Sequence, residues 1–240
     1  MVVDAMVDAM ASSAYTGGLN FNEENQQLAE FLENRGWYTH HPDRPLMNEE
    51  VMDYLGHLGL TMRADHPPEI STISPNNYQS ERYLANTNEG MGFHTDNVYL
   101  PTPCKYLAMY CIKSAERGGA TQLSDIRAII PHIDGVTLAE LRKNQWVWQR
   151  PIRIGKGPSS PQAVLGQDGS IRWWRHGLKN QEPHLLEIAS TFDEMIDTSS
   201  SNVRFTLTPG ELVIIDNYRI MHAREPFSGN ERELLRVRIW

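Results

Sequence analysis

Two stretches near the start of the chain carry apolar residues at helical spacing. ENQQLAEFLENRG, residues 24–36, predicts an amphipathic helix that stops at its final glycine. Its apolar face consists of Leu28, Phe31 and Leu32. WYTHH, residues 37–41, is typical of a short strand. NEEVMDYLGHLG, residues 48–59, predicts a second helix, with Asn48 as its N-cap and Gly59 near its end.

From Tyr83 onward the pattern changes to short alternating or apolar segments that Gly, Pro and Asn separate. Such segments predict strands. The expected strands are YLAMYCI (106–112), GATQLSDI (119–126), QWVWQRPIRI (145–154), SIRWWR (170–175), VRFTL (203–207), ELVIID (211–216) and ELLRVRIW (233–240). Helices are expected near residues 125–133 or 137–143, and near 181–196. We therefore expect a mainly β fold with helical cover, built as a β-sandwich or jelly roll.

The length of 240 residues is enough for one sizeable core and does not require a second. We expect residues 1–20 to be a loose leader and residues 21–240 to be a single domain. No segment approaches the uninterrupted apolar length of a membrane helix. The N-terminal segment lacks the basic region of a secretory signal and contains Asp4 and Asp8, so we expect a cytoplasmic protein.

Charge and cysteine content exclude two further classes. A net charge of −8 argues against nucleic acid as a partner, because binding to phosphates depends on clustered Lys and Arg. The two cysteines, Cys104 and Cys111, are expected to be buried free thiols rather than a disulfide. They lack companions at zinc-site spacing, so a cysteine-based metal site is not expected.

GFHTDNVY, residues 92–99, places a histidine and an aspartate in one predicted strand. Because side chains alternate along a strand, His94 and Asp96 should project to the same side and could hold one ion. A lone His-x-Asp is common, so a third ligand is needed. His222 is the best candidate, since it follows the buried-strand pattern ELVIIDNYRIM. We interpret the other histidines as structural or surface residues: His40, His41, His57, His66, His132, His176 and His184.

Two histidines and one carboxylate are the ligand set of non-haem Fe(II) oxygenases, although they also suit catalytic zinc. A 2-oxoacid that chelates iron can supply electrons, and its far carboxylate then needs a cation. Arg236 and Arg238 lie on one face of the predicted last strand and are candidates for that role. Two alternatives remain at this point: a zinc-dependent hydrolase on a jelly-roll scaffold, and a jelly-roll binding protein without catalysis.

Four ordered motifs resemble a known family. HTDNVY, GGATQLSD, LVIIDNYRIMHAREPF and LLRVRIW are similar to segments of the TauD/TfdA and clavaminate-synthase-like Fe(II)/2-oxoglutarate-dependent oxygenases. The resemblance extends to the helix, strand and helix near the start, and it covers nearly all of the chain beyond the leader. It implies a double-stranded β-helix, or jelly-roll, core. This chain is shorter than the typical member, and it is compact after Gln149.

The resemblance also implies residue roles. It makes three residues the iron ligands: His94, Asp96 and His222. It places the hydroxyl of Thr121 on a carboxylate of 2-oxoglutarate. The family's arginine, some fourteen residues after the distal histidine, falls on Arg236, with Arg238 as a lesser possibility.

Five further residues receive lesser roles from the resemblance. Gly118 and Gly119 would be turn residues, and Asp216 and Asn217 would position a strand end rather than contact iron. Arg224 shares a strand face with His222 and could reach substrate or 2-oxoglutarate.

The implied activity is an Fe(II)- and 2-oxoglutarate-dependent dioxygenase that uses O2 and converts the co-substrate to succinate and CO2. Hydroxylation is expected, and desaturation or cyclisation would start from the same chemistry. Asp96 fills the carboxylate position that halogenating relatives leave empty, which argues against halogenation. The implied substrate is a small molecule, such as an amino acid or an intermediate of specialised metabolism, and no membrane partner is expected.

Strand alternation also predicts where substrate lies. If the strand of His94 runs back regularly, four residues share the metal's side: Gly92, Gly90, Asn88 and Asn86. Glycines in a strand mark a bulge or a close approach, so they would leave room beside the ion. A bulge would change which residues face inward. The other expected opening is toward Trp173 and Arg175.

Overall fold

The computed structural model places most of the chain. It describes residues 21–60, 67–75, 84–152, 154–155 and 157–240. The expected leader, residues 1–20, and His66 lie outside the described residues. No helix in this part of the chain combines the length and apolar character needed to cross a lipid bilayer.

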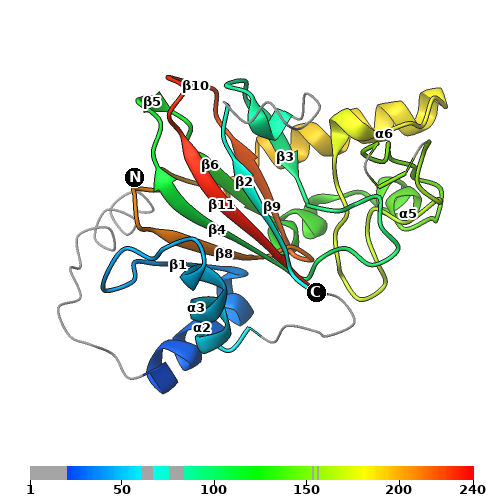
Figure 1. The fold of residues 1–240 in the computed structure, drawn as a ribbon. Coiled ribbons are helices and arrows are strands. Elements are labelled where there is room, and N and C mark those ends of the chain that lie inside the picture. Colours follow the sequence, from blue (N-terminus) through cyan, green and yellow to red (C-terminus); the bar gives the residue numbers. More distant parts are fainter. Residues whose placement is uncertain (1–20, 61–66, 76–83, 153, 156) are drawn as a thin grey trace.

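Two antiparallel sheets form the centre of the molecule (Figure 1). The larger sheet has the strand order β1 (Trp37–His40), β8 (Leu212–Asp216), β4 (Tyr106–Lys113), β11 (Glu233–Ile239) and β2 (Glu69–Ile73). The smaller sheet has the order β3 (Met91–His94), β9 (Ile220–Arg224), β6 (Thr121–Asp125) and β7 (Val203–Phe205). A two-stranded ribbon pairs β5 (Arg117–Gly118) with β10 (Phe227–Ser228). The predicted mainly β jelly-roll fold with helical cover is confirmed.

Strand alternation divides the apolar residues of the larger sheet between two cores. One face of β4 packs between the sheets through Leu107, Met109 and Cys111. The opposite face packs under the N-terminal helices through Ala108 and Tyr110. On β11 the interior side carries Leu234, so Arg236 and Arg238, which follow at alternate positions, also face the space between the sheets. Cys104 and Cys111 are buried free thiols, as predicted.

The two N-terminal helices cover the outer face of the larger sheet (Figure 1). Gly36 terminates α2 (Phe21–Arg35). It adopts a φ of 78°, a left-handed conformation that glycine adopts without steric strain, and its N–H donates to the carbonyl groups of Phe31 and Leu32. α3 (Glu50–His57) begins later than predicted, and Asn48 is not its N-cap. The carboxylate of Glu50 instead accepts the N–H of Met47, which closes the turn before the helix.

A second group of helices and turns packs beside the smaller sheet. It comprises α4 (Ile126–Ile129), α5 (Gly135–Leu141), α6 (Pro183–Asp197) and the short 3-10 turns η1 (Leu84–Asn86), η2 (Ile130–His132) and η3 (Arg175–Gly177). Both alternative helix predictions near residues 125–143 therefore hold, and the one near 181–196 is confirmed.

Two predicted strands are wrong. The described residues of segments 145–154 and 170–175 form isolated bridges rather than strands, with neighbouring loops and, at Trp174, with His94 at the end of β3. Their apolar character has another cause, because Trp146, Trp148 and Trp173 are fully buried in the core beside α6. An apolar run indicates burial, and burial alone does not distinguish a strand from a packed loop.

Candidate metal centre

His94 and Asp96 reach the site from a strand end and a turn. β3 ends at His94, and its register against β9 shifts between Met91 and His94. Asp96 lies in the following turn, where Asn97 adopts a φ of 60°, a conformation that few non-glycine residues adopt. The two side chains do approach one another. They do so because the chain turns, so the expectation of one regular strand was wrong.

His222 completes the group from the neighbouring strand. The segment ELVIIDNYRIM is not one strand, because the chain turns at residues 217–219 and continues as β9 in the other sheet. This places His222 directly opposite His94, with ring centroids 4.1 Å apart. Asp96 Oδ1 lies 3.7 Å from Nε2 of His94 and 3.5 Å from Nε2 of His222. All three side chains are buried.

The His94 ring and the Asp96 carboxylate are in the protonation states that metal binding requires. Nδ1 of His94 lies 2.9 Å from the Gly92 carbonyl oxygen, which can only accept, so Nδ1 carries the hydrogen and Nε2 presents its lone pair. Burial, reinforced by His222, lowers the pKa of His94 to about 3, so this ring is neutral at neutral pH. Metal binding then needs no proton to leave His94.

Asp96 is ionised for a different reason. Burial alone would raise the pKa of its carboxyl group, but Arg238 and Arg236 outweigh burial and hold that pKa well below its usual range. The site therefore combines a neutral imidazole at His94 with an anionic carboxylate at Asp96, and first-row divalent ions bind both kinds of donor.

The spacing of the donors also fits an ion. Two ligand atoms that are each about 2.1 Å from a metal and at right angles to one another lie about 3 Å apart. The carboxylate oxygen and the two imidazole nitrogens are slightly farther apart, and the ligand atoms of the group all lie within 4.8 Å of one another. Small side-chain movements would close this gap. Among the described residues, His94, Asp96 and His222 form the group with this geometry.

Asn217 holds the turn that carries Asp96. Its side-chain oxygen accepts the Asp96 N–H at 2.8 Å, and its amide nitrogen donates to the Asp96 carbonyl at 3.1 Å and to the Cys104 carbonyl at 2.9 Å. Asp216 instead forms an ion pair with Lys105 at 2.7 Å. Both residues therefore fix the end of β8, as the sequence indicated.

We expect Asn217→Ala to lower the free energy of unfolding by about 2–3 kcal/mol, because it leaves the backbone groups of Asp96 buried without partners. It should also weaken Co(II) binding, since the turn loses its orientation. Urea unfolding and metal titration measure the two effects. Asn180→Ala is the matched control, because Asn180 is also buried and bonds the backbone of Gln145 and Val147. Equal metal binding in the two variants would contradict the role of Asn217.

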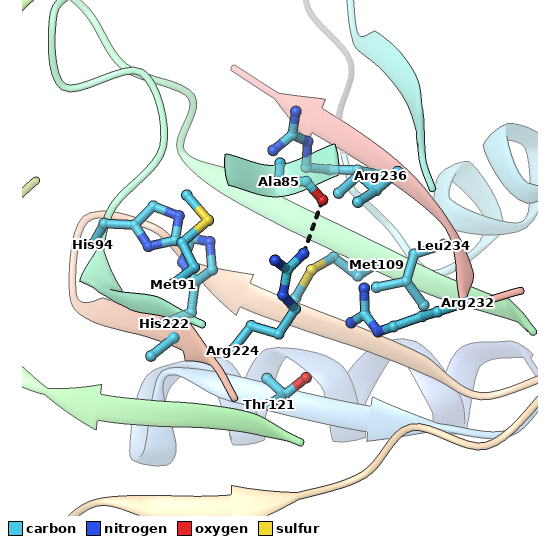
Figure 2. A pocket seen from close by; sticks show the side chains of 12 residues that line it. Ala85, Met91, His94, Met109, Thr121, His222, Arg224, Arg232, Leu234 and Arg236 are labelled. Atoms are coloured by element: carbon cyan, nitrogen blue, oxygen red, sulfur yellow. Dashed lines mark hydrogen bonds between the residues drawn. The ribbon is translucent and has the colours of Figure 1, made fainter. Parts of the chain in front are cut away.

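A pocket opens beside His94 and His222 (Figure 2). Its walls come from both sheets and from the segment before β3. The lining residues are Ile73, Ala85, Met91, His94, Met109, Thr121, His222, Ala223, Arg224, Arg232, Leu234 and Arg236. Thr121 and Arg236, the two residues predicted to bind the co-substrate, thus share one pocket with the histidines. Nearby, Gly118 and Gly119 adopt φ of 76° and 74°, which favour glycine. They are not turn residues as expected, because Gly118 pairs with Phe227 in β5 and Gly119 directly follows that strand.

The pocket also contains Arg232, a cation that counting residues from His222 to the family's arginine did not identify. Arg232 is buried, and none of the described residues accepts a hydrogen bond or an ion pair from its guanidinium, which stacks 5.3 Å from the Phe227 ring. A buried, unneutralised arginine beside a pocket favours an anionic ligand. Arg232 precedes β11, and the pairing of β11 with β4 shifts register between Glu233 and Leu234, so strand alternation in the sequence could not place Arg232 in the pocket.

Arg224 has a structural role in the wall of the pocket. Its guanidinium donates to the carbonyl oxygens of Ala85 at 2.8 Å, Thr87 at 2.8 Å and Glu89 at 2.6 Å (Figure 2 shows the first bond). Burial, and then the nearby Arg232, lower the pKa of Arg224 to about 10. The hydrogen bonds from Arg224 therefore fix the segment of residues 85–89, which leads into β3.

The predicted substrate side of β3 needs correction. The register shift at Met91 means that Met91, not Gly92, lines the pocket with His94, and Gly92 is exposed. Trp173 is fully buried and donates to Asp193 at 3.0 Å, so it lies away from the pocket opening. Arg175 is partly exposed in η3 and does not line the pocket.

Curated proteins with related sequences include a synthase and a hydroxylase. Clavaminate synthase 2 of Streptomyces clavuligerus is 28% identical over 160 residues, which cover 61% of this chain and 49% of that protein. Enduracididine beta-hydroxylase of Streptomyces hygroscopicus is 27% identical over 200 residues, which cover 68% of this chain and 56% of that protein. The chain thus spans about half the length of these relatives.

Solved structures share the fold. The crystal structure of an asparagine oxygenase superposes with a TM-score of 0.74 at 16% identity, covering 91% of this chain and 79% of that one. The non-haem iron oxygenase OrfP, in complex with Fe and alpha-ketoglutaric acid, gives a TM-score of 0.68 at 17% identity, with coverage of 91% and 79%. The model of the taurine catabolism dioxygenase TauD, TfdA family matches residues 40–164 and 174–238, well over half of the sequence. With the two-histidine, one-carboxylate group set in a jelly-roll core, the chain belongs to the TauD, TfdA family.

Proposed function

We propose that this protein is an Fe(II)- and 2-oxoglutarate-dependent oxygenase that hydroxylates a small molecule. The observation that carries the proposal is the group formed by His94, Asp96 and His222 beside a pocket whose other polar groups are cationic or hydroxyl. A facial set of two histidines and one carboxylate leaves the opposite positions of an octahedral ion open for a chelating 2-oxoacid and O2. Residues 21–240 would act as one catalytic domain.

The pocket suits a dianionic co-substrate whose two ends need different partners. The 2-oxoacid end belongs next to the metal ligands, where Arg236 lies 3.4 Å from Asp96 Oδ2. Arg232 lies four residues earlier on the chain and lines the same pocket, so it can pair with the far carboxylate through two parallel hydrogen bonds. Thr121 contributes a hydroxyl to the same ligand. We therefore assign the far carboxylate to Arg232 and Thr121, and the end near the metal to Arg236.

Bound iron and 2-oxoglutarate would supply the oxidising chemistry, in which O2 is reduced, the co-substrate yields succinate and CO2, and an oxygen atom passes to the substrate. The protein's own contribution is position and exclusion of water. His94, Asp96 and His222 fix the ion, Asn217 fixes the turn of Asp96, and the arginines orient the co-substrate. Met91 and the segment that Arg224 holds border the space left for substrate.

A zinc-dependent hydrolase is the competing reading of the same ligands. It needs a general base within reach of the metal-bound water. Among the described residues that line the pocket, none is an aspartate or glutamate, whereas three are arginines. That composition favours an anionic co-substrate and supports the oxygenase.

For the substrate we propose an amino acid or a related small molecule. The support is the naming of the relatives, which include a beta-hydroxylase of enduracididine and an asparagine oxygenase. Asp96 occupies the carboxylate position among the proposed metal ligands. This supports hydroxylation of the substrate rather than halogenation. Succinate release in the presence of Fe(II), 2-oxoglutarate and O2 tests the proposal against a panel of amino acids and small amines. Release that stays at the no-substrate level for every candidate would argue against this substrate class.

We expect Met91→Trp to lower kcat/KM for the substrate by at least about tenfold, because the larger ring displaces groups beside the ion. Gly92→Val is the control. Gly92 is exposed, and a side chain there first meets His176 at an ordinary 3.7 Å. Steady-state kinetics with both variants measure the difference. A larger defect in Gly92→Val would place the substrate on the other side of β3.

A further inference from the structure

The two oxygens of Asp96 have different surroundings. Oδ1 faces Nε2 of His94 and of His222, at 3.7 Å and 3.5 Å. Oδ2 points the other way and accepts a hydrogen bond from Nε of Arg238 at 2.5 Å. The Arg236 guanidinium lies 3.4 Å from the same oxygen. One oxygen is thus directed at the candidate ion and the other is occupied by cations.

Arg238 is itself fixed in place. Its side chain is buried, and its Nη1 lies 3.0 Å from Glu69 Oε1 in an ion pair. Glu69 is the first residue of β2 and pairs across the sheet with Arg238. Two residues later on β2, Ser71 accepts a hydrogen bond from Nε of Arg236 at 3.3 Å. The edge strand therefore holds both arginines against Asp96.

We infer that Arg238 is a positioning residue that restricts Asp96 to coordination through Oδ1 alone. A carboxylate with both oxygens free can bind an ion with both, and the second oxygen then takes one more coordination position. Three protein ligands, a bidentate 2-oxoacid and O2 together fill an octahedral ion. Engagement of Oδ2 by Arg238 preserves the sixth position. This inference rests on the proposed function, because it concerns the ligand set of that metal.

A structural ion pair makes a different prediction from a positioning role. If Arg238 only neutralised the buried charge of Asp96, its loss would lower stability and leave coordination unchanged. If it occupies Oδ2, its loss frees that oxygen to approach the ion. A measurement of the carboxylate mode separates the two cases, and it requires no turnover.

The experiment uses the full chain labelled with carboxyl-13C aspartate and loaded anaerobically with Co(II). Isotope-edited infrared spectra give the separation of the two carboxylate stretching bands, which is wide for one-oxygen and narrow for two-oxygen coordination. The unaltered protein should show a wide separation for Asp96, identified by its loss in Asp96→Gly. Arg238→Gln should narrow it, and Arg238→Lys, which keeps a cationic donor, should restore it at least in part.

Arg219→Gln is the matched control, because Arg219 is also buried and forms an ion pair with Asp125 at 2.6 Å outside the site. It should lose stability without a change in band separation. A wide separation in Arg238→Gln, or an equal narrowing in Arg219→Gln, would overturn the inference. If Arg238→Gln does not fold, Glu69→Gln, which releases Arg238 from the edge strand, should narrow the separation, and an unchanged value there would overturn it. Failure of the unaltered protein to bind Co(II) would overturn the proposed metal site itself.

Discussion

Replacement of His222 by alanine is expected to reduce substrate oxidation to the background rate, and His94→Ala should do the same. Each histidine would supply one of three protein ligands, and two ligands hold a first-row ion far more weakly than three. The fold should survive, because the two histidines stand beside cores that are built from apolar residues of both sheets and their helices. Iron content after gel filtration and succinate release measure the two effects.

His184→Ala is the control for loss of a histidine, since His184 is exposed on α6. It should retain iron and activity. Near-normal turnover in His94→Ala or His222→Ala would contradict the ligand assignment. Asp96→Gly should also lose hydroxylation, and we do not expect it to gain halogenation.

Arg232→Gln is expected to raise the KM for 2-oxoglutarate by about 30- to 1,000-fold. Loss of one charged, bidentate contact costs on the order of 2–4 kcal/mol, and each 1.4 kcal/mol corresponds to about a factor of ten. Arg236→Gln should have a smaller effect on this KM, because Arg236 lies near the metal ligands and is already hydrogen-bonded to Ser71. Thr121→Ala removes one neutral contact and should have the smallest effect.

Arg219→Gln again serves as the comparison for loss of a buried arginine, and its KM for 2-oxoglutarate should stay unchanged. Initial rates at varied 2-oxoglutarate, with substrate saturating, give the four values. A larger rise in Arg236→Gln than in Arg232→Gln would return the far carboxylate to Arg236, the residue that spacing from His222 indicated.

Much of the sheet could be predicted because its strands have well-marked patterns. β4, β8 and β11 alternate or run apolar between turn residues, and their predicted positions agree with the structure. The pattern failed where large aromatic residues sit in loops, as at residues 145–154. There the tryptophan side chains are buried in the core, while the described backbone makes only isolated bridges.

The sequence indicated which three residues gather at the candidate metal centre, but not the backbone geometry that brings them together. His94, Asp96 and His222 gather as the motifs indicated. The bulge before His94 and the turn at Asn97 leave no clear mark in residue alternation, so the inward face of β3 was assigned incorrectly. Arg232 was overlooked because counting from His222 assumes a fixed length for the connection between β9 and β11. Only the placement of that connection shows which arginine reaches the pocket unpaired.

His94, Asp96 and His222 are proposed to bind an Fe(II) ion that 2-oxoglutarate chelates in the adjoining pocket. Anaerobic addition of Fe(II) and then 2-oxoglutarate to the purified protein tests this proposal most directly, with visible absorption as the readout. We expect a weak metal-to-ligand charge-transfer band that needs both additions, is absent with Zn(II), and is lost in His222→Ala. If the protein binds Fe(II) but gives no such band at saturating 2-oxoglutarate, 2-oxoglutarate does not chelate the ion. If the band persists in His222→Ala, His222 is not a ligand.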